Sequence, residues 1–202
     1  ARDAFYVGDI ASKIVKYHKE NGGLMTADDM ASYATPVEKP LSINFRGTEV
    51  YSCRPWCQGP VLLQMLNMLN DIDLKAMGHN STNYIHYLAE TIKLSFADRE
   101  RYYGDPNFVD VPVEKLLSSE FARQRQEQID LQKAWSKMPP AGEIEGFGGI
   151  SLRSKINSDA SFSEPDTSYT CTMDKHGNVC SITPSDVSFE SPVIPGLGFC
   201  PS

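Results

Sequence analysis

Two strand pairs that turn back on themselves limit what this chain of 202 residues can fold into. Runs rich in β-branched and aromatic residues occur in pairs, at 41–45 with 49–53 and at 167–174 with 179–183. A short turn with a glycine separates the members of each pair, Gly47 in the first and Gly177 in the second. Turns this short join antiparallel neighbours, because parallel strands need a crossover of about a dozen or more residues. The sequence therefore predicts two hairpins.

Helical patterns surround both hairpins. Apolar residues recur at helical spacing in stretches that we expect to be helices, at 3–21, from Thr26 onward, at 61–69, at 80–103 and, as two short helices, within 113–129. Residues 193–200 have a strand-like pattern. This order predicts an α+β domain in which antiparallel strands pack under helices. No glycine-rich loop follows a strand, so a βαβ nucleotide-binding fold is not expected.

The second hairpin follows a segment that has almost no core-forming pattern. Residues 136–166 are rich in Gly, Pro and polar side chains, so a flexible segment leads onto a strand that begins with Thr167. A threonine hydroxyl needs an adjacent base to act as a nucleophile. Cutting the peptide bond before Thr167 would create that base, since an α-amino group has an ordinary pKa of about 8. The alternative is that Thr167 is only a β-forming residue and the segment only a loop.

Composition excludes several classes of function. The formal net charge of −7 and the lack of a basic stripe argue against a nucleic-acid partner. No run of apolar residues is long enough to span a membrane. The four histidines are scattered, so no metal site and no cofactor are expected. The chain begins and ends inside sequence with structural patterns, and we expect it to be part of a longer protein.

The five cysteines, 53, 57, 171, 180 and 200, are odd in number. Cys53 and Cys57 do not have a standard zinc spacing. Cys171 and Cys180 can face each other across the second hairpin, but sequence position alone does not establish a disulfide. We expect buried free thiols, which favours a reducing, cytoplasmic compartment.

Four stretches, taken in order, resemble the γ-glutamyltransferase (γ-glutamyltranspeptidase) family of N-terminal-nucleophile hydrolases, and residues 183–186 and 191–199 resemble a divergent branch of it. The four stretches are residues 22–30, 46–52, 95–108 and 166–178. The resemblance implies an αββα four-layer sandwich of which this chain holds only a part. It also implies that residues 1–166 are the C-terminal part of the large-subunit region, ending in a flexible pre-cleavage segment. Residues 167–202 would then begin the small-subunit region.

The resemblance further implies a zymogen that cuts itself between Asp166 and Thr167. The Thr167 hydroxyl would be the nucleophile, and its freed amine the base and later the acid. Ser168 stands where the family usually has a second threonine that orients the nucleophile, and Ser185 where another threonine approaches the new amine. The implied activity is cleavage of γ-glutamyl amides such as glutathione through a threonyl acyl-enzyme, which is then passed to water or to an amino acid or peptide.

The implied partners are a small amide or γ-glutamyl peptide and the two subunits of one precursor, as a heterodimer or a higher oligomer. The glycine pair of the oxyanion hole would lie beyond residue 202, so the isolated fragment is expected to be inactive. The substrate-binding residues are not assigned. Family members are often periplasmic or extracellular, in contrast to the compartment that the cysteines favour.

Several positions depart from the family pattern. Tyr169 replaces the usual histidine, Val187 aligns near a substrate-binding asparagine, and the loop 56–60 has fewer Ser and Gly residues than usual. These departures leave two alternatives open. One is a related small-amide amidase of the same fold, and the other is a non-catalytic or uncleaved member that acts as a binding or structural protein. Asp98 and Arg99 are expected to form a structural ion pair.

Overall fold

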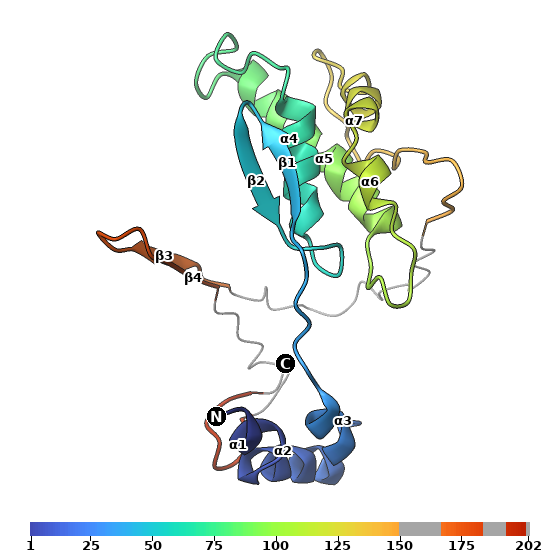
Figure 1. Ribbon diagram of the computed structural model, residues 1–202. Coiled ribbons are helices and arrows are strands. Elements are labelled where there is room, and N and C mark those ends of the chain that lie inside the picture. The colour runs from blue at the N-terminus through green and yellow to red at the C-terminus, as the bar shows by residue number, and fades with distance from the viewer. Residues whose placement is uncertain (150–166, 184–192, 201–202) are drawn as a thin grey trace. The chain divides into compact units, whose positions relative to one another are not determined.

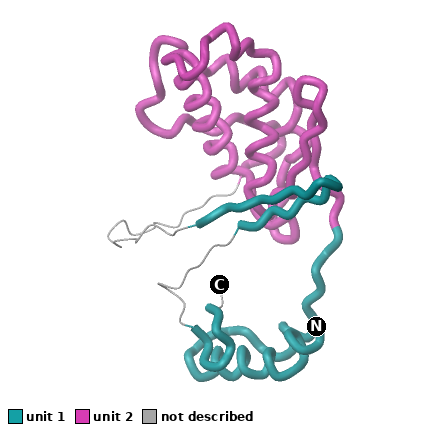
Figure 2. Tube along the Cα trace, turned by 90° about the vertical axis from the view of Figure 1, so that its left-hand side faces the viewer, with its two compact units in different colours: residues 1–37, 156–202 teal, residues 38–155 magenta. Residues whose placement is uncertain are grey.

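The computed structural model describes residues 1–149, 167–183 and 193–200. The chain divides into two compact units, shown in Figure 2. Unit 1 comprises residues 1–37 and 156–202, and unit 2 comprises residues 38–155. Three residues singled out in the sequence, Asp166, Ser185 and Val187, lie outside the described residues.

Unit 2 begins with the first predicted hairpin. Strands β1 (Leu41–Phe45) and β2 (Thr48–Ser52) are antiparallel, with Leu41 opposite Ser52 and Phe45 opposite Thr48. The two turn residues, Arg46 and Gly47, have φ values of 52° and 85°. Positive φ at both central residues defines the type I′ turn, whose twist matches that of the flanking strands. The hairpin is confirmed, with its second strand one residue earlier than expected.

Four helices follow the hairpin in unit 2 (Figure 1). They are α4 (Gly59–Leu69), α5 (Thr82–Tyr102), α6 (Val113–Leu116) and α7 (Ser119–Gln126). Helix α4 lies beside α5 and α7, and the β1–β2 hairpin packs against α4. The predicted long helix is confirmed, and the Ser81 hydroxyl caps it by accepting from the Tyr84 N–H at 3.1 Å. The two short helices predicted within 113–129 are also confirmed.

The core of unit 2 contains a buried ion pair whose partners differ from those predicted from the sequence. We expected Asp98 to pair with Arg99, but Asp98 pairs with Arg125 of α7. The Asp98 side chain is buried in the core, where the Arg125 side chain also lies, whereas the Arg99 side chain is 27% exposed. Arg99 instead pairs with Glu100 and donates to Gln58 Oε1 at 2.6 Å.

The helices of unit 1 are α1 (Arg2–Tyr6), α2 (Asp9–Glu20) and α3 (Ala27–Ser32). The prediction of one helix over 3–21 is wrong, because the helix is interrupted at Val7 and Gly8. The N–H groups of Val7 and Gly8 both donate to the Asp3 carbonyl, at 3.0 and 2.7 Å, which ends α1. A Cβ at Gly8 would lie 2.9 Å from the Ala4 carbonyl oxygen, so this close approach requires glycine.

Residues 193–200 also belong to unit 1, and they form turns rather than the predicted strand. The Leu197 N–H donates to the Ile194 carbonyl at 3.0 Å, and the Ile194 N–H donates to the Phe199 carbonyl at 3.1 Å. Gly196 and Gly198 have φ values of 79° and 73°, which reverse the chain and prevent an extended run. Ile194 is buried in a core cluster with residues of α2 and α3.

Candidate active site

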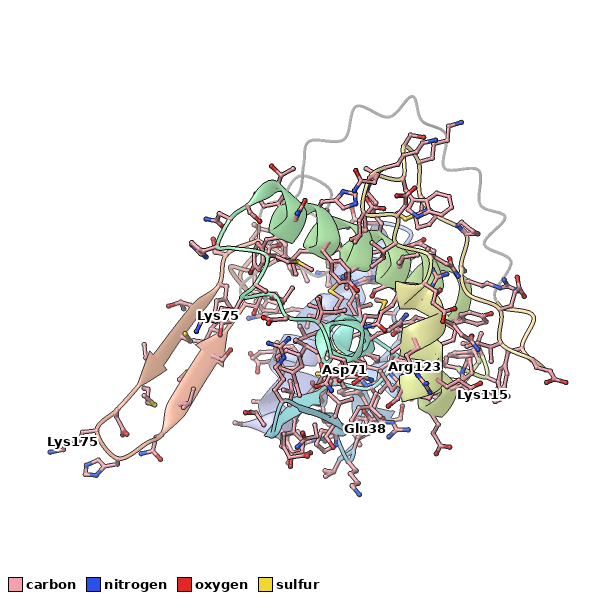
Figure 3. All side chains as sticks on the ribbon, turned by 90° about the horizontal axis from the view of Figure 1, so that it is seen from above. Glu38, Asp71, Lys75, Lys115, Arg123 and Lys175 are labelled. Carbon is pink, nitrogen blue, oxygen red and sulfur yellow. The ribbon has the colours of Figure 1, made fainter. Side chains whose placement is uncertain are left out.

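The second hairpin carries the predicted catalytic residues. Its strands are β3 (Thr170–Met173) and β4 (Val179–Ile182), which pair with Thr170 opposite Ile182 and Met173 opposite Val179. The predicted first strand began at Thr167, so β3 is shorter than expected at its start. Lys175 lies in the turn at the tip of the hairpin (Figure 3). All residues of both strands are exposed.

The turn of this hairpin is held by Asp174. Its Oδ1 accepts from the backbone N–H groups of His176 and Asn178, at 2.8 and 2.9 Å, and its Oδ2 accepts from Asn178 Nδ2 at 2.8 Å. The Asn178 side chain is the main reason that the pKa of Asp174 is below its ordinary value, and the backbone N–H donors lower it further. Gly177 has a φ of 85°, so the chain reverses without strain.

The sequence of residues 166–178 predicted the turn but not the role of Asp174 in it. The sequence signal for this role was Asp174 placed three residues before the Gly177-Asn178 dipeptide of the turn. Asp side chains in turns accept hydrogen bonds from the backbone two residues on. Asp174 therefore shapes the turn of the hairpin. The rigid turn fixes the register of the strand that follows the candidate nucleophile.

Thr167 and Ser168 are both exposed and lie just before β3, from which Tyr169 separates them. Thr167 occupies a β-bridge position, so the candidate nucleophile lies on extended backbone. Tyr169, which stands where the family usually has histidine, is 64% exposed, and its hydroxyl accepts from Ser181 Oγ at 3.3 Å. Since Asp166 and Ser185 lie outside the described residues, the proposed roles of these two residues stay predictions.

The cysteines depart from expectation in two respects. All five are free, but Cys53, Cys171 and Cys180 are exposed rather than buried. The register places Thr172 opposite Cys180 and Cys171 opposite Ser181. Because side chains alternate between the faces of a strand, Cys171 and Cys180 point to opposite faces of the hairpin. The expectation that these two thiols can face each other is wrong.

Unit 1 has an apolar cavity away from the predicted catalytic residues. It has a volume of about 550 Å³ and is lined mostly by apolar and aromatic side chains, among them Tyr6, Met30, Tyr33 and Phe199. None of the predicted catalytic residues lines it. In the part of the chain that the structure describes, no three His, Cys, Asp or Glu side chains gather so that they could hold a metal ion. Across the same residues, no helix is both long and apolar enough to cross a membrane.

Comparison with known proteins settles the family. Residues 1–200 match the sequence profile described as Gamma-glutamyltranspeptidase. This chain belongs to the gamma-glutamyltranspeptidase family. The expected family membership is thus confirmed, and with it the α+β fold, of which the chain carries a part.

Curated relatives and solved structures agree with this membership. The glutathione hydrolase proenzyme of Escherichia coli (strain K12) is 35% identical over 182 residues, which are 90% of this chain and 29% of that protein. The acylase ACY 1 proenzyme of Pseudomonas sp. (strain SE83) is 32% identical over 184 residues, again 90% of this chain and 29% of that protein. The crystal structure of Helicobacter pylori gamma-glutamyltranspeptidase aligns with a TM-score of 0.65 at 36% identity, over 69% of this chain and 41% of that one.

The chain spans under a third of the length of these two curated relatives, since it covers 29% of each. In this chain, the candidate nucleophile precedes a hairpin whose two strands are exposed on both faces. A two-stranded hairpin is at best marginally stable by itself. The exposed strands therefore agree with a chain that carries only part of the family's fold.

Proposed function

We propose that the full-length protein is a self-processing amidohydrolase or acyltransferase that cleaves γ-glutamyl amides, such as glutathione, through Thr167. The observation that carries the proposal is the position of Thr167, which is exposed and lies three residues before Thr170, the first residue of β3, in a member of this family. Relatives named glutathione hydrolase proenzyme support both the substrate class and maturation from a precursor.

The first step is scission of the peptide bond between Asp166 and Thr167. It divides the chain into residues 1–166, the end of a large subunit, and residues 167–202, the start of a small subunit. The released α-amino group belongs to the same residue as the nucleophilic hydroxyl. Since the ordinary pKa of such an amine is about 8, a useful fraction is neutral near physiological pH and accepts the hydroxyl proton.

The second step is attack of the Thr167 oxygen on the γ-carbonyl carbon of the substrate. The amine takes the hydroxyl proton and then donates it to the departing amine of the substrate, which leaves an ester on Thr167. Water or an acceptor amine then attacks the ester and restores the hydroxyl. Backbone N–H donors for the oxyanion, which supply the largest share of such catalysis, belong to sequence beyond residue 202.

Ser168 and Ser185 are assigned as positioning residues. Each keeps a hydroxyl where the family usually has threonine, so each can orient the nucleophile or its amine by a hydrogen bond. Tyr169 replaces the family histidine, and its hydroxyl accepts a hydrogen bond from Ser181 Oγ across the hairpin. The proposed cleavage chemistry thus depends on Thr167, Ser168 and Ser185, which all keep a hydroxyl group. The γ-glutamyl specificity depends on the position of Val187, whose side chain cannot accept a hydrogen bond, and on residues outside this chain.

The test is turnover of γ-glutamyl anilide and of glutathione by the full-length protein. Replacing Thr167 with Ala should abolish both reactions, a loss on the order of 10⁴-fold or more, because the nucleophile and its base act as one unit. Thr167→Ser keeps a hydroxyl and an amine and should keep part of the activity. Equal turnover by the wild-type protein and T167A would contradict the proposal.

A related small-amide amidase is the second candidate function. The acylase ACY 1 relative favours it, and so do the departures at Tyr169 and Val187. Turnover of small dicarboxylic amides but not of γ-glutamyl anilide would select this candidate. A non-catalytic family member, the third alternative, would turn over neither and would stay one chain.

A further inference from the structure

The loop that joins β2 to α4 holds two thiols four positions apart. Cys53 directly follows β2 and is exposed, whereas Cys57 is half-buried and lies just before α4. The loop reverses between them, because the Cys57 N–H donates to the Arg54 carbonyl at 3.2 Å. The Cys57 thiol lies over the same turn and contacts the Arg54 carbonyl at 3.6 Å.

Gly59, the first residue of α4, contacts both cysteines. Its N–H donates to Cys57 Sγ at 3.4 Å. A Cβ on Gly59 would lie 2.5 Å from the Cys53 carbonyl oxygen and 2.9 Å from the Cys53 nitrogen, so the backbone of Gly59 packs directly on that of Cys53. Since one residue touches both the Cys53 backbone and the Cys57 sulfur, the Cys57 thiol lies close to the backbone of Cys53.

The two thiols have different surroundings. Burial is the main reason that the pKa of the Cys57 thiol is raised, and the neighbouring Cys53 and Glu38 side chains raise it further, although the Gly59 N–H opposes the change. Glu38, labelled in Figure 3, also accepts from Trp56 Nε1 at 2.7 Å. The thiolate is the attacking form in exchange with disulfides, so the exposed Cys53 is the more accessible first reactant.

We propose that Cys53 and Cys57 form a reversible disulfide by exchange with a low-molecular-weight disulfide, such as glutathione disulfide. The Cys53 thiolate attacks one sulfur of the reagent, which gives a mixed disulfide and releases one thiolate. The Cys57 thiolate then attacks the Cys53 sulfur, closes the protein disulfide and displaces the second thiolate. The released thiolates take up the two protons lost by the cysteines. Two protein thiols are oxidised and one reagent disulfide is reduced, so the exchange balances without another oxidant.

The second hairpin supplies a matched control within the same chain. Cys171 and Cys180 are also exposed and lie on neighbouring strands, yet they point to opposite faces of the hairpin. A disulfide requires the two Cβ atoms to lie about 4 Å apart with their bonds directed toward each other. These two cysteines therefore form separate mixed disulfides with the same reagent and do not bridge.

The experiment incubates the reduced full-length protein with excess glutathione disulfide at about pH 8, close to the ordinary cysteine pKa of about 8.5. Acid quenching, alkylation and peptide mapping then identify each sulfur. We expect a Cys53–Cys57 bridge that dithiothreitol reverses, and separate mixed disulfides on Cys171 and Cys180. In Cys57→Ser, Cys53 should keep the mixed disulfide, because its resolving partner is gone. In Cys53→Ser, Cys57 should react more slowly than Cys53 does in the wild type.

Tryptophan fluorescence gives a second measurement that does not depend on mapping. These 202 residues include two tryptophans, and Trp135→Phe leaves Trp56, which stands between the two cysteines in sequence, as the only tryptophan among them. A bridge on both sides of Trp56 should change its emission when the reagent is added and restore it on reduction. In the W135F background, the C57S variant cannot form the Cys53–Cys57 disulfide. It should therefore lack the part of the emission change that this disulfide causes. Persistent mixed disulfides on both Cys53 and Cys57, or no reaction of either, would overturn the proposal.

Discussion

Asp98 and Arg125 form an ion pair with both side chains out of contact with solvent. Arg125 Nε lies 3.1 Å from Asp98 Oδ2, and the two side chains are 1% and 0% exposed. Gly142 donates its N–H to Asp98 Oδ1 at 2.7 Å, and Arg125 donates to the Pro140 carbonyl at 3.0 Å. The pair thus fastens the loop around residues 140–142 to helices α5 and α7.

Burial opposes the charged form of each partner in this pair. It raises the pKa of Asp98 and lowers that of Arg125, while the attraction between the two charges acts in the opposite direction. The Gln64 side chain is a further donor to Asp98. Arg125, Gln64 and the Gly142 N–H all donate to the Asp98 carboxyl group, so removing either partner of the pair leaves the other buried without its counter-charge.

The buried pair predicts a large loss of stability on truncation. Asp98→Ala should lower the free energy of unfolding by about 3–5 kcal/mol, since Arg125 then remains buried and unpaired. The matched control is Glu143→Ala, which breaks the Arg101–Glu143 pair, whose side chains are 27% and 82% exposed. That change should cost far less stability than Asp98→Ala, because solvent screens an exposed ion pair. Urea unfolding measures both, and equal losses for the two variants would contradict the structural role of Asp98.

Ile194 predicts a contact that outlasts chain scission. It is 1% exposed and packs with Ala11, Ile14 and Met30 of α2 and α3. If the chain is cut before Thr167, Ile194 belongs to the second fragment and its partners to the first. Ile194→Ala should therefore cost about 2–5 kcal/mol of stability. In the cut protein it should also loosen the association of the two fragments in gel filtration.

Val193, the neighbour of Ile194, provides the control because it is 53% exposed. Val193→Ala should change stability by no more than about 0.5 kcal/mol and should leave the fragments associated. If both variants dissociated equally, the contact at Ile194 would not be the one that joins the fragments.

The turn of the second hairpin should weaken in acid. Hydrogen bonds from Asn178 and the backbone lower the pKa of Asp174 in the folded state. A lowered carboxyl pKa contributes stability that is present above the ordinary value of about 3.9 and is lost as the pH falls through the lower folded value. The Asn178 amide resonance in NMR spectra should therefore shift below about pH 4. In Asp174→Asn this shift should disappear, and an unchanged shift in that variant would exclude Asp174 as its cause.

Local patterns were sufficient where the structure depends on neighbours in sequence. The turn glycines predicted both hairpins, and the periodic apolar residues of 80–103 predicted α5. The same patterns did not predict the features that depend on contacts between residues far apart in the sequence. Nothing near Asp98 in sequence marks Arg125 as its partner, and nothing near 193–200 shows that Ile194 is buried against α2 and α3.

The candidate site was predicted to a similar extent. Residue type, spacing and family resemblance selected Thr167, and its exposure at the start of the hairpin is compatible with that choice. The opposite directions of Cys171 and Cys180 depend on the strand register, which the turn fixes and composition does not show. The contact of Gly59 with the Cys53 backbone is likewise visible only in the three-dimensional structure, because it depends on the path of the loop between β2 and α4.

The intact-mass spectrum of the full-length protein tests the central claim most directly, because Thr167 gains its base only by scission of the chain. After prolonged incubation we predict two fragments, the second with Thr167 as its amino-terminal residue, and a single uncut chain for T167A. A wild-type protein that remains one chain and still hydrolyses γ-glutamyl anilide, or that is cut at another bond, would contradict the account.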